Sequence, residues 1–252
     1  MKNLFVVGAQ RSGSTYLYNV LNNHPQITMA EPVRPEPKFF LDDDLYAKGR
    51  TYYEDKYFTS CSAGTQYYGE KSTSYIESLE AARRIWSFYP DARVILILRD
   101  PVQRAWSNYC FSVQHGMETL DFKSALAMES ERIENTSFSS SVSPFAYRSR
   151  GDYINYINDY LSVFPPDQLR VLIFEEFVGE IQEVHKLYRW LGVDDAIEPA
   201  SLSEVVNPTS SSPPHPKPVL RELAKGFSSS LDRLEAYLSR PVNCWRKAWD
   251  EM

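Results

Sequence analysis

The segment Leu4-Phe-Val-Val-Gly-Ala-Gln-Arg-Ser-Gly-Ser-Thr-Tyr-Leu17 decides the fold. Its apolar run at residues 4–7 is followed by two glycines and two hydroxyl residues, and then by apolar residues at helical spacing. This pattern predicts a strand, a tight loop and a helix. Backbone N–H groups in such a loop, together with the positive end of the helix dipole, bind anions. The segment therefore predicts a phosphate site at residues 11–15 that needs no metal.

The loop differs in one position from the common nucleotide-binding pattern. Gly8 and Gly13 have the spacing of G-x-x-x-x-G-K-S/T, but Ser14 occupies the lysine position and the nearest cation is Arg11. The lysine that clamps β- and γ-phosphates is therefore absent, which argues against an ATP-dependent kinase. The loop suits a single phosphate that carries a further group on its outer side.

Composition narrows the function classes. The chain has 252 residues, a length that allows one large domain or two small ones, and we expect one domain over residues 1–252. Its formal net charge is −6 and it contains no run of basic residues, which argues against nucleic-acid binding. Its three cysteines form no C-x-x-C pair, which favours a reduced, cytoplasmic setting and no thiolate zinc site. No apolar run approaches the ~20 residues of a membrane span. We expect no metal site and no membrane partner.

Strand and helix patterns alternate along the rest of the chain. The apolar run at 93–98 does not alternate with polar residues, which is typical of a central strand covered on both faces. The pattern predicts an α/β fold, a single P-loop-like domain with a central, mainly parallel sheet and helices on both faces. Further strands are expected at 27–29, in the segment 67–75 and at 169–174, and further helices at 42–64, 78–89, 101–111, 121–134, 153–164, 181–191 and 219–238.

A second anion site is predicted after the strand at 93–98. Arg99 follows this strand, Asp100 and Pro101 suit the start of a helix, and Ser107 lies two turns further along that helix. Arg99 and Ser107 are therefore placed to hold an anion together. The alternative, a helix cap with a surface salt bridge, stays open.

Four charged residues are predicted on the ligand side of the sheet. Prolines at three positions make residues 31–41 a stiff loop that carries Glu36 and Lys38. Glu70 and Lys71 stand at the end of the next predicted strand. Open α/β sheets bind ligands beyond the carboxyl ends of their strands, so we expect these side chains near the ligand.

Two serine-rich segments are expected to be irregular. Residues 199–218 carry six of the sixteen prolines and predict an active-site lid, from which Lys217 can reach an anion. Residues 136–146 lack any periodic pattern and predict a loop.

Together these segments resemble the sulfotransferases that use 3′-phosphoadenosine 5′-phosphosulfate (PAPS). The resemblance covers nearly the whole chain and rests on the order and spacing of four stretches, at 6–15, 98–109, 164–172 and 174–177. It implies that Arg99 and Ser107 hold the 3′-phosphate. It also implies that the first loop cradles the 5′-phosphosulfate through Arg11, Ser12, Gly13, Ser14 and Thr15.

Two further segments resemble the bacterial and glycan-modifying branch of this family. The stretch Glu36-Pro-Lys-Phe-Phe40 is similar to its E-x-H-F-F segment, which implies Glu36 as general base, with Lys38 at the position of the histidine. The stretch Gly69-Glu-Lys-Ser-Thr-Ser-Tyr75 is similar to G-E-K-S/T-P-x-Y, with Ser74 near the expected proline. It implies that Glu70 and Lys71 line the acceptor side.

The implied reaction is an in-line transfer of the sulfuryl group from PAPS to a hydroxyl or a nitrogen of a small-molecule or glycan acceptor. Adenosine 3′,5′-bisphosphate (PAP) leaves, Glu36 takes the acceptor proton, Arg11 and Lys71 stabilise developing charge, and Lys38 and Glu70 bind the acceptor. His115 is the alternative base. A nucleotide-binding protein without catalysis and, less supported, an ATP-dependent kinase are the competing interpretations.

Overall fold

The computed structural model describes residues 2–59, 63–135, 143–203 and 215–252. These residues form two compact units, the first from residues 2–98 and 159–203 and the second from residues 99–158 and 215–252. The predicted loop at 136–146 and the predicted lid at 199–218 lie largely outside the described residues. That one domain spans residues 1–252 stays a prediction.

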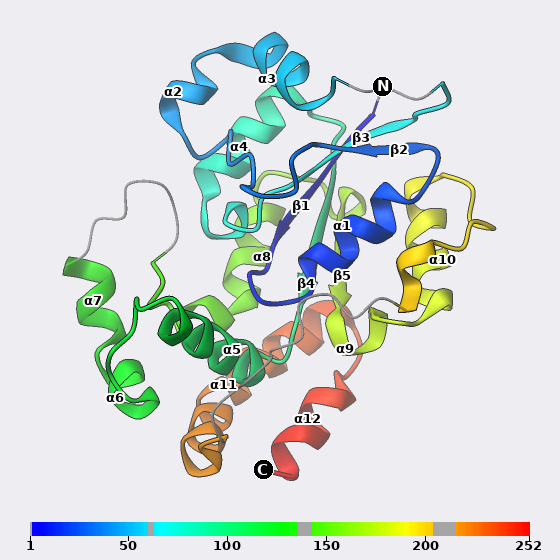
Figure 1. Cartoon of the computed structure of the whole chain (residues 1–252). Helices are drawn as coiled ribbons and strands as arrows, with labels where there is room; N and C mark the ends of the chain where they lie inside the picture. The colour runs from blue at the N-terminus through cyan, green and yellow to red at the C-terminus, as the bar shows by residue number, and fades with distance from the viewer. Residues whose placement is uncertain (1, 60–62, 136–142, 204–214) are drawn as a thin grey trace. The chain divides into compact units, whose positions relative to one another are not determined.

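The first unit is built on a five-stranded parallel sheet with strand order β2-β3-β1-β4-β5 (Figure 1). This confirms the predicted α/β fold class. The strand at 93–98 has a neighbour on each side, as its apolar run requires, although β1 rather than this strand is in the middle of the sheet. The strands are β1 (Lys2–Gly8), β2 (Ile27–Met29), β3 (Tyr67–Lys71), β4 (Arg93–Leu98) and β5 (Leu169–Ile173).

Helices cover both faces of this sheet. On one face, Leu4 and Val6 of β1 share a buried cluster with α1 and α10, and on the other face Phe5 packs against Phe40 and Tyr89, with ring centroids 5.6 and 5.9 Å away. Alternate residues of a strand point to opposite faces, which explains why β1 is apolar from Leu4 to Val7. The helices of this unit are α1 (Ser14–Asn22), α2 (Asp43–Tyr46), α3 (Gly49–Tyr57), α4 (Leu79–Phe88), α9 (Phe174–Phe177) and α10 (Ile181–Leu191), with 3-10 turns at Tyr75–Glu77, Pro166–Gln168 and Ala200–Ser203.

The second unit is helical. Apolar side chains of α5, α6 and α11 form its core around Trp106 and Tyr147. The predicted single helix at 121–134 is two helices, and the helix expected from residue 219 begins at Lys217, so Lys217 is part of a helix and not of a lid. The helices are α5 (Pro101–Gln114), α6 (Phe122–Ala127), α7 (Glu129–Asn135), α8 (Tyr153–Leu161, whose last residues belong to the first unit), α11 (Lys217–Leu238) and α12 (Asn243–Asp250), with a 3-10 turn at Ser149–Gly151.

The loop between β1 and α1 needs glycine at two positions. A Cβ on Gly8 would lie 2.6 to 2.9 Å from three side-chain atoms of Ile76. Gly13 has a φ of 79°, in the left-handed region, and a Cβ there would overlap the ring of Phe174. The loop can therefore pass tightly between the sheet and its neighbours only because these positions have no side chain.

Gly13→Ala is expected to destabilise the protein more than Gly179→Ala. Both residues have a left-handed φ (79° and 81°), but a Cβ on Gly179 has nothing within 4 Å. Left-handed backbone costs an alanine roughly 1 to 2 kcal/mol, and the overlap with Phe174 adds about 1 to 3 kcal/mol at Gly13 only. Urea denaturation of both variants measures the difference. Equal losses would show that Phe174 moves aside freely.

Candidate functional site

The site lies at the carboxyl edge of the sheet in the first unit. β1 and β3 run parallel with Val6 paired to Lys71, and the amide of Ser72 donates to the carbonyl of Val6 at 3.1 Å. The loop after β1 and the turn after β3 therefore emerge side by side. A side-chain contact joins them, because Gln10 Nε2 donates to Ser74 Oγ at 3.4 Å.

The loop after β1 presents donors. Arg11 has a φ of 63°, and Ser12 is fully buried with its hydroxyl directed at the carbonyl of Gln10 at 3.4 Å. The N-cap of α1 is Gly13, which has no side chain with which to cap the first amides of the helix. Residues 8–15 contain a guanidinium, hydroxyls and amides but no carboxylate. This donor set fits a phosphosulfate group.

Glu36 and Lys71, both predicted from the sequence, meet in an ion pair. Lys71 Nζ lies 2.5 Å from Glu36 Oε1, and the two side chains are 3% and 15% exposed, with Glu36 the more accessible. Thr73 completes the arrangement, since its amide donates to Glu36 Oε2 at 2.9 Å and its hydroxyl lies 3.1 and 3.0 Å from Oε1 and Oε2. Sequence reasoning missed Thr73, although its hydroxyl two positions after Lys71 was the available signal.

Glu70 is enclosed by protein groups. It is 1% exposed and accepts hydrogen bonds from the Tyr53 hydroxyl and Ser72 Oγ, both at 2.6 Å. Burial raises the pKa of Glu70 to about 6, against the lowering effect of these hydroxyl donors. The predicted contact of Glu70 with an acceptor stays a prediction.

Lys38 is half-buried, with a φ of 51°. Its amide donates to Ser72 Oγ at 2.9 Å, so the backbone of the proline-rich segment is attached to the turn after β3. The predicted role of the Lys38 side chain in acceptor binding stays a prediction.

The predicted second anion site begins the second unit. Asp100 caps α5 as expected, accepting from the amides of Val102 (2.8 Å) and Gln103 (3.4 Å), and it also accepts from Trp249 Nε1 at 3.1 Å. The Tyr153 hydroxyl donates to the carbonyl of Arg99 at 2.7 Å.

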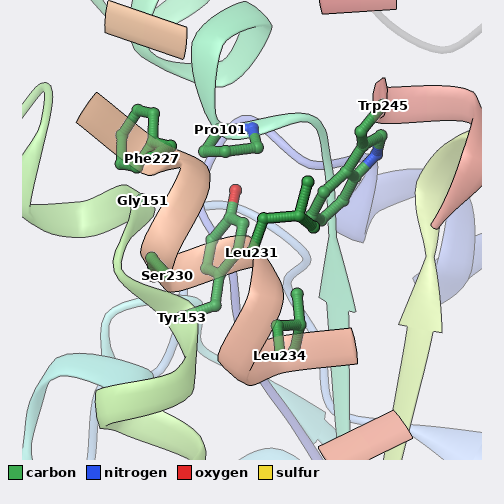
Figure 2. Close-up of a pocket in the computed structure, with 8 residues that line it drawn as sticks. All are labelled: Pro101, Gly151, Tyr153, Phe227, Ser230, Leu231, Leu234 and Trp245. Atoms are coloured by element: carbon green, nitrogen blue, oxygen red, sulfur yellow. The ribbon is translucent and has the colours of Figure 1, made fainter. Parts of the chain in front are cut away.

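Ser107 lies further along α5 and is 7% exposed. Figure 2 shows Tyr153, Pro101 and Trp245 among the side chains that line a small, mostly apolar cavity. The turn that carries Arg99 and Asp100 is held by the side chains of Tyr153 and Trp249 and by the backbone amides of Val102 and Gln103, all in the same unit.

His115, the alternative base, is the C-cap of α5, as its sequence setting suggested. It is exposed, its Nδ1 lies 2.8 Å from the carbonyl of Phe111, and its ring lies 4.0 Å from the Phe111 ring. These contacts give it a role at the helix end.

In the residues that the structure describes, no three His, Cys, Asp or Glu side chains are grouped so as to hold a metal ion. Among the described helices, none combines the length and apolar character needed to cross a bilayer.

A parallel sheet with a donor-rich loop after its middle strand, beside a carboxylate paired with a lysine, is the arrangement of a group-transfer enzyme that takes a phosphate-bearing donor. The chain belongs to the sulfotransferase family: its sequence matches the profile described as "Sulfotransferase family" at residues 3–61 and 46–197. It is thus a sulfotransferase-family enzyme, and this family uses PAPS as its sulfuryl donor.

Similar proteins agree with this assignment. The crystal structure of a sulfotransferase from Alicyclobacillus acidocaldarius superposes with a TM-score of 0.78 at 30% identity, over 98% of this chain and 99% of that one. Mouse sulfotransferase SULT7A1 complexed with PAP shares the fold, with a TM-score of 0.50 at 14% identity over 77% of this chain and 60% of that one.

Curated relatives include a bifunctional heparan sulfate N-deacetylase/N-sulfotransferase 1 from Caenorhabditis briggsae, which is 29% identical over 204 residues, 77% of this chain. The human bifunctional heparan sulfate N-deacetylase/N-sulfotransferase 3 is 32% identical over 173 residues, 66% of this chain. The chain spans only 23% and 19% of the length of these two relatives.

The raised pKa of Glu70 predicts that this residue makes folding stability fall as the pH rises from about 4.5 to about 6. In this window the folded protein keeps a proton on Glu70 that the unfolded chain, with a pKa of 4.5, releases. The effect approaches about 2 kcal/mol and is nearly complete at about pH 7. Urea denaturation of the wild type and Glu70→Gln at pH 4.5 and 7 measures it, because the stability difference between them should change by this amount. A difference that does not vary with pH would contradict the prediction.

Proposed function

We propose that this chain transfers the sulfuryl group of PAPS to a hydroxyl or nitrogen of a small-molecule or glycan acceptor, with Glu36 as general base. The observation that carries the proposal is the Glu36–Lys71 pair beside the donor-rich loop, linked to it by the Gln10–Ser74 contact. When bound, PAPS supplies the sulfuryl group and PAP is released.

The donor is proposed to bind through two groups of residues. The loop after β1 holds the phosphosulfate end, because its amides and hydroxyls and Arg11 are all donors to negative oxygens. By the resemblance to the family, Arg99 and Ser107 hold the 3′-phosphate. The loop residues concerned are Arg11, Ser12, Gly13, Ser14 and Thr15.

Proton removal is assigned to Glu36. Lys71 Nζ and the Thr73 hydroxyl both lie within hydrogen-bond distance of Oε1. To accept a proton at Oε1, Glu36 has to release Lys71, whose ammonium then becomes available to the negative charge that develops on the donor side. Lys71 is thus proposed to stabilise the carboxylate at rest and the reacting groups during transfer. Thr73 keeps the carboxylate oriented throughout.

The acceptor class is proposed from charge and relatives together. Heparan sulfate N-sulfotransferases among the relatives favour an amine or hydroxyl on a sugar. The net charge of −6 disfavours a long polyanion, which binds best to a basic groove. A short or uncharged acceptor, held in part by Lys38, fits both observations.

PAP is expected to stabilise the protein against heat, and ATP with magnesium is not. A ligand at a hundredfold excess over its Kd contributes ~2.7 kcal/mol to the free energy of unfolding.

Arg99→Ala should weaken PAP binding about 10- to 100-fold, since a hydrogen bond to a charged group contributes about 1.5 to 3 kcal/mol. Adenosine 5′-monophosphate lacks the 3′-phosphate, so its weaker binding should not change in this variant. An equal effect of Arg99→Ala on both nucleotides would refute the 3′-phosphate assignment.

Glu36→Gln is expected to abolish transfer while leaving PAP binding intact. The protein is incubated with PAPS and a cell lysate, and mass spectrometry detects molecules that gain one sulfuryl group. Loss of a general base lowers the rate about 10²- to 10⁴-fold. Glu31→Gln, an exposed carboxylate on the same proline-rich segment, is the matched control and should transfer at the wild-type rate. Equal turnover by Glu36→Gln would remove Glu36 as the base.

A further inference from the structure

The segment that carries Glu36 is fastened by two backbone amides. Residues 31–41 belong to no helix or strand, so no ladder of backbone hydrogen bonds holds them. The amide of Lys38 donates to Ser72 Oγ at 2.9 Å, and the amide of Phe40 donates to the Tyr75 hydroxyl at 3.1 Å. Both attachments lie within four residues of Glu36, on its carboxyl-terminal side.

Glu70 orients the hydroxyls that receive these amides. Ser72 Oγ donates to Glu70 Oε1 at 2.6 Å. The Tyr75 hydroxyl lies near the same carboxylate, since burial and then the charge of Glu70 raise the pKa of Tyr75. A hydroxyl has a single proton, so a serine that donates to a carboxylate turns its lone pairs to other donors. An ionised carboxylate only accepts, which sets the direction of each bond from amide to hydroxyl to carboxylate.

The side chains of this relay are buried, and each has a hydrogen-bond partner. Glu70, Ser72, Tyr75 and Tyr53 are each at most 1% exposed, and Tyr53 occupies the other oxygen of Glu70 at 2.6 Å. Hydrogen bonds in such surroundings hold their geometry firmly, because breaking one leaves a buried polar group unpaired. Two adjacent strand residues thus contact the segment that carries Glu36. Lys71 binds the Glu36 carboxylate directly, and Glu70 is linked through Ser72 to the backbone amide of Lys38.

We propose that Glu70 is a positioning residue for sulfuryl transfer, which fixes the backbone of residues 38–40 through Ser72 and Tyr75 and thereby the place of the Glu36 carboxylate. The inference rests on the proposed function of Glu36 as base. This role differs from the predicted contact of Glu70 with an acceptor, because here the enclosed carboxylate acts through Ser72 and Tyr75.

Three variants test the relay. Glu70→Gln keeps the side-chain shape but replaces an acceptor oxygen with a donor. Ser72→Ala removes the hydroxyl that accepts from the Lys38 amide, and Tyr75→Phe removes the hydroxyl that accepts from the Phe40 amide. Each should lower kcat about 10- to 100-fold, because small displacements of a reacting group cost rates of this size. The Kd for PAP should stay within twofold of the wild-type value.

The matched control is Tyr188→Phe, which removes a buried hydroxyl that donates to the carbonyl of Val20 at 2.9 Å, in the same unit. It should leave kcat unchanged. Amide hydrogen exchange at Lys38 and Phe40 should accelerate in Ser72→Ala and Tyr75→Phe respectively and stay slow in the control. This second readout needs no acceptor.

The outcomes separate this inference from the proposed function. Turnover is scored as PAP released from PAPS in the acceptor-containing lysate. Wild-type exchange rates at both amides in the variants, or wild-type kcat in all three, would overturn the positioning role while leaving Glu36 in place. A wild-type protein that neither binds PAP nor releases it from PAPS would instead refute the proposed function.

Discussion

The ion pair between Glu36 and Lys71 depends on a single constraint, the parallel pairing of β3 with its neighbours in the sheet. The pairing with β2 places the proline-rich segment that carries Glu36 beside the end of β3, and on its other side β3 pairs with β1. Because both strands run in the same direction, the donor-rich loop after Gly8 and the turn after Lys71 must emerge at one edge of the sheet. The ammonium of Lys71 then lies where the proline-rich segment can reach it. An antiparallel β3 would put Lys71 at the far end of β1, away from that loop.

The pair is also largely removed from water, which affects the free energy of burying its charges. Lys71 is 3% exposed, and an ammonium removed from water is costly unless a carboxylate compensates it. The resting protein therefore holds a lysine that needs a negative partner and a carboxylate that accepts from Thr73 as well. In the proposed reaction, Lys71 exchanges the Glu36 carboxylate for the negative charge that develops on the donor side.

The predicted anion site depends on the hydrogen-bond donors of one loop and not on the overall charge of the protein. The chain carries a net charge of −6, yet residues 8–15 contain no carboxylate and present amides, hydroxyls and a guanidinium in one loop. Fixed backbone dipoles act over short distances and need no basic surface around them. Acidic residues elsewhere bind other parts of the fold: Asp100 caps α5, and Glu70 accepts a hydrogen bond from the Ser72 hydroxyl.

The sequence by itself determined what short-range physics controls. The strand, loop and helix of residues 4–17, the buried strand at 93–98 and the Asp100 cap were all readable, because apolar period, glycine spacing and capping act within a few residues. The tertiary structure alone decided that Glu36 pairs with Lys71 and binds Thr73, and that Glu70 is enclosed. Glu36 and Lys71 are separated by 35 positions in the chain, and only the pairing of parallel strands brings them within 2.5 Å. Strand pairing is set by packing across the whole sheet, so no local pattern of residues encodes it.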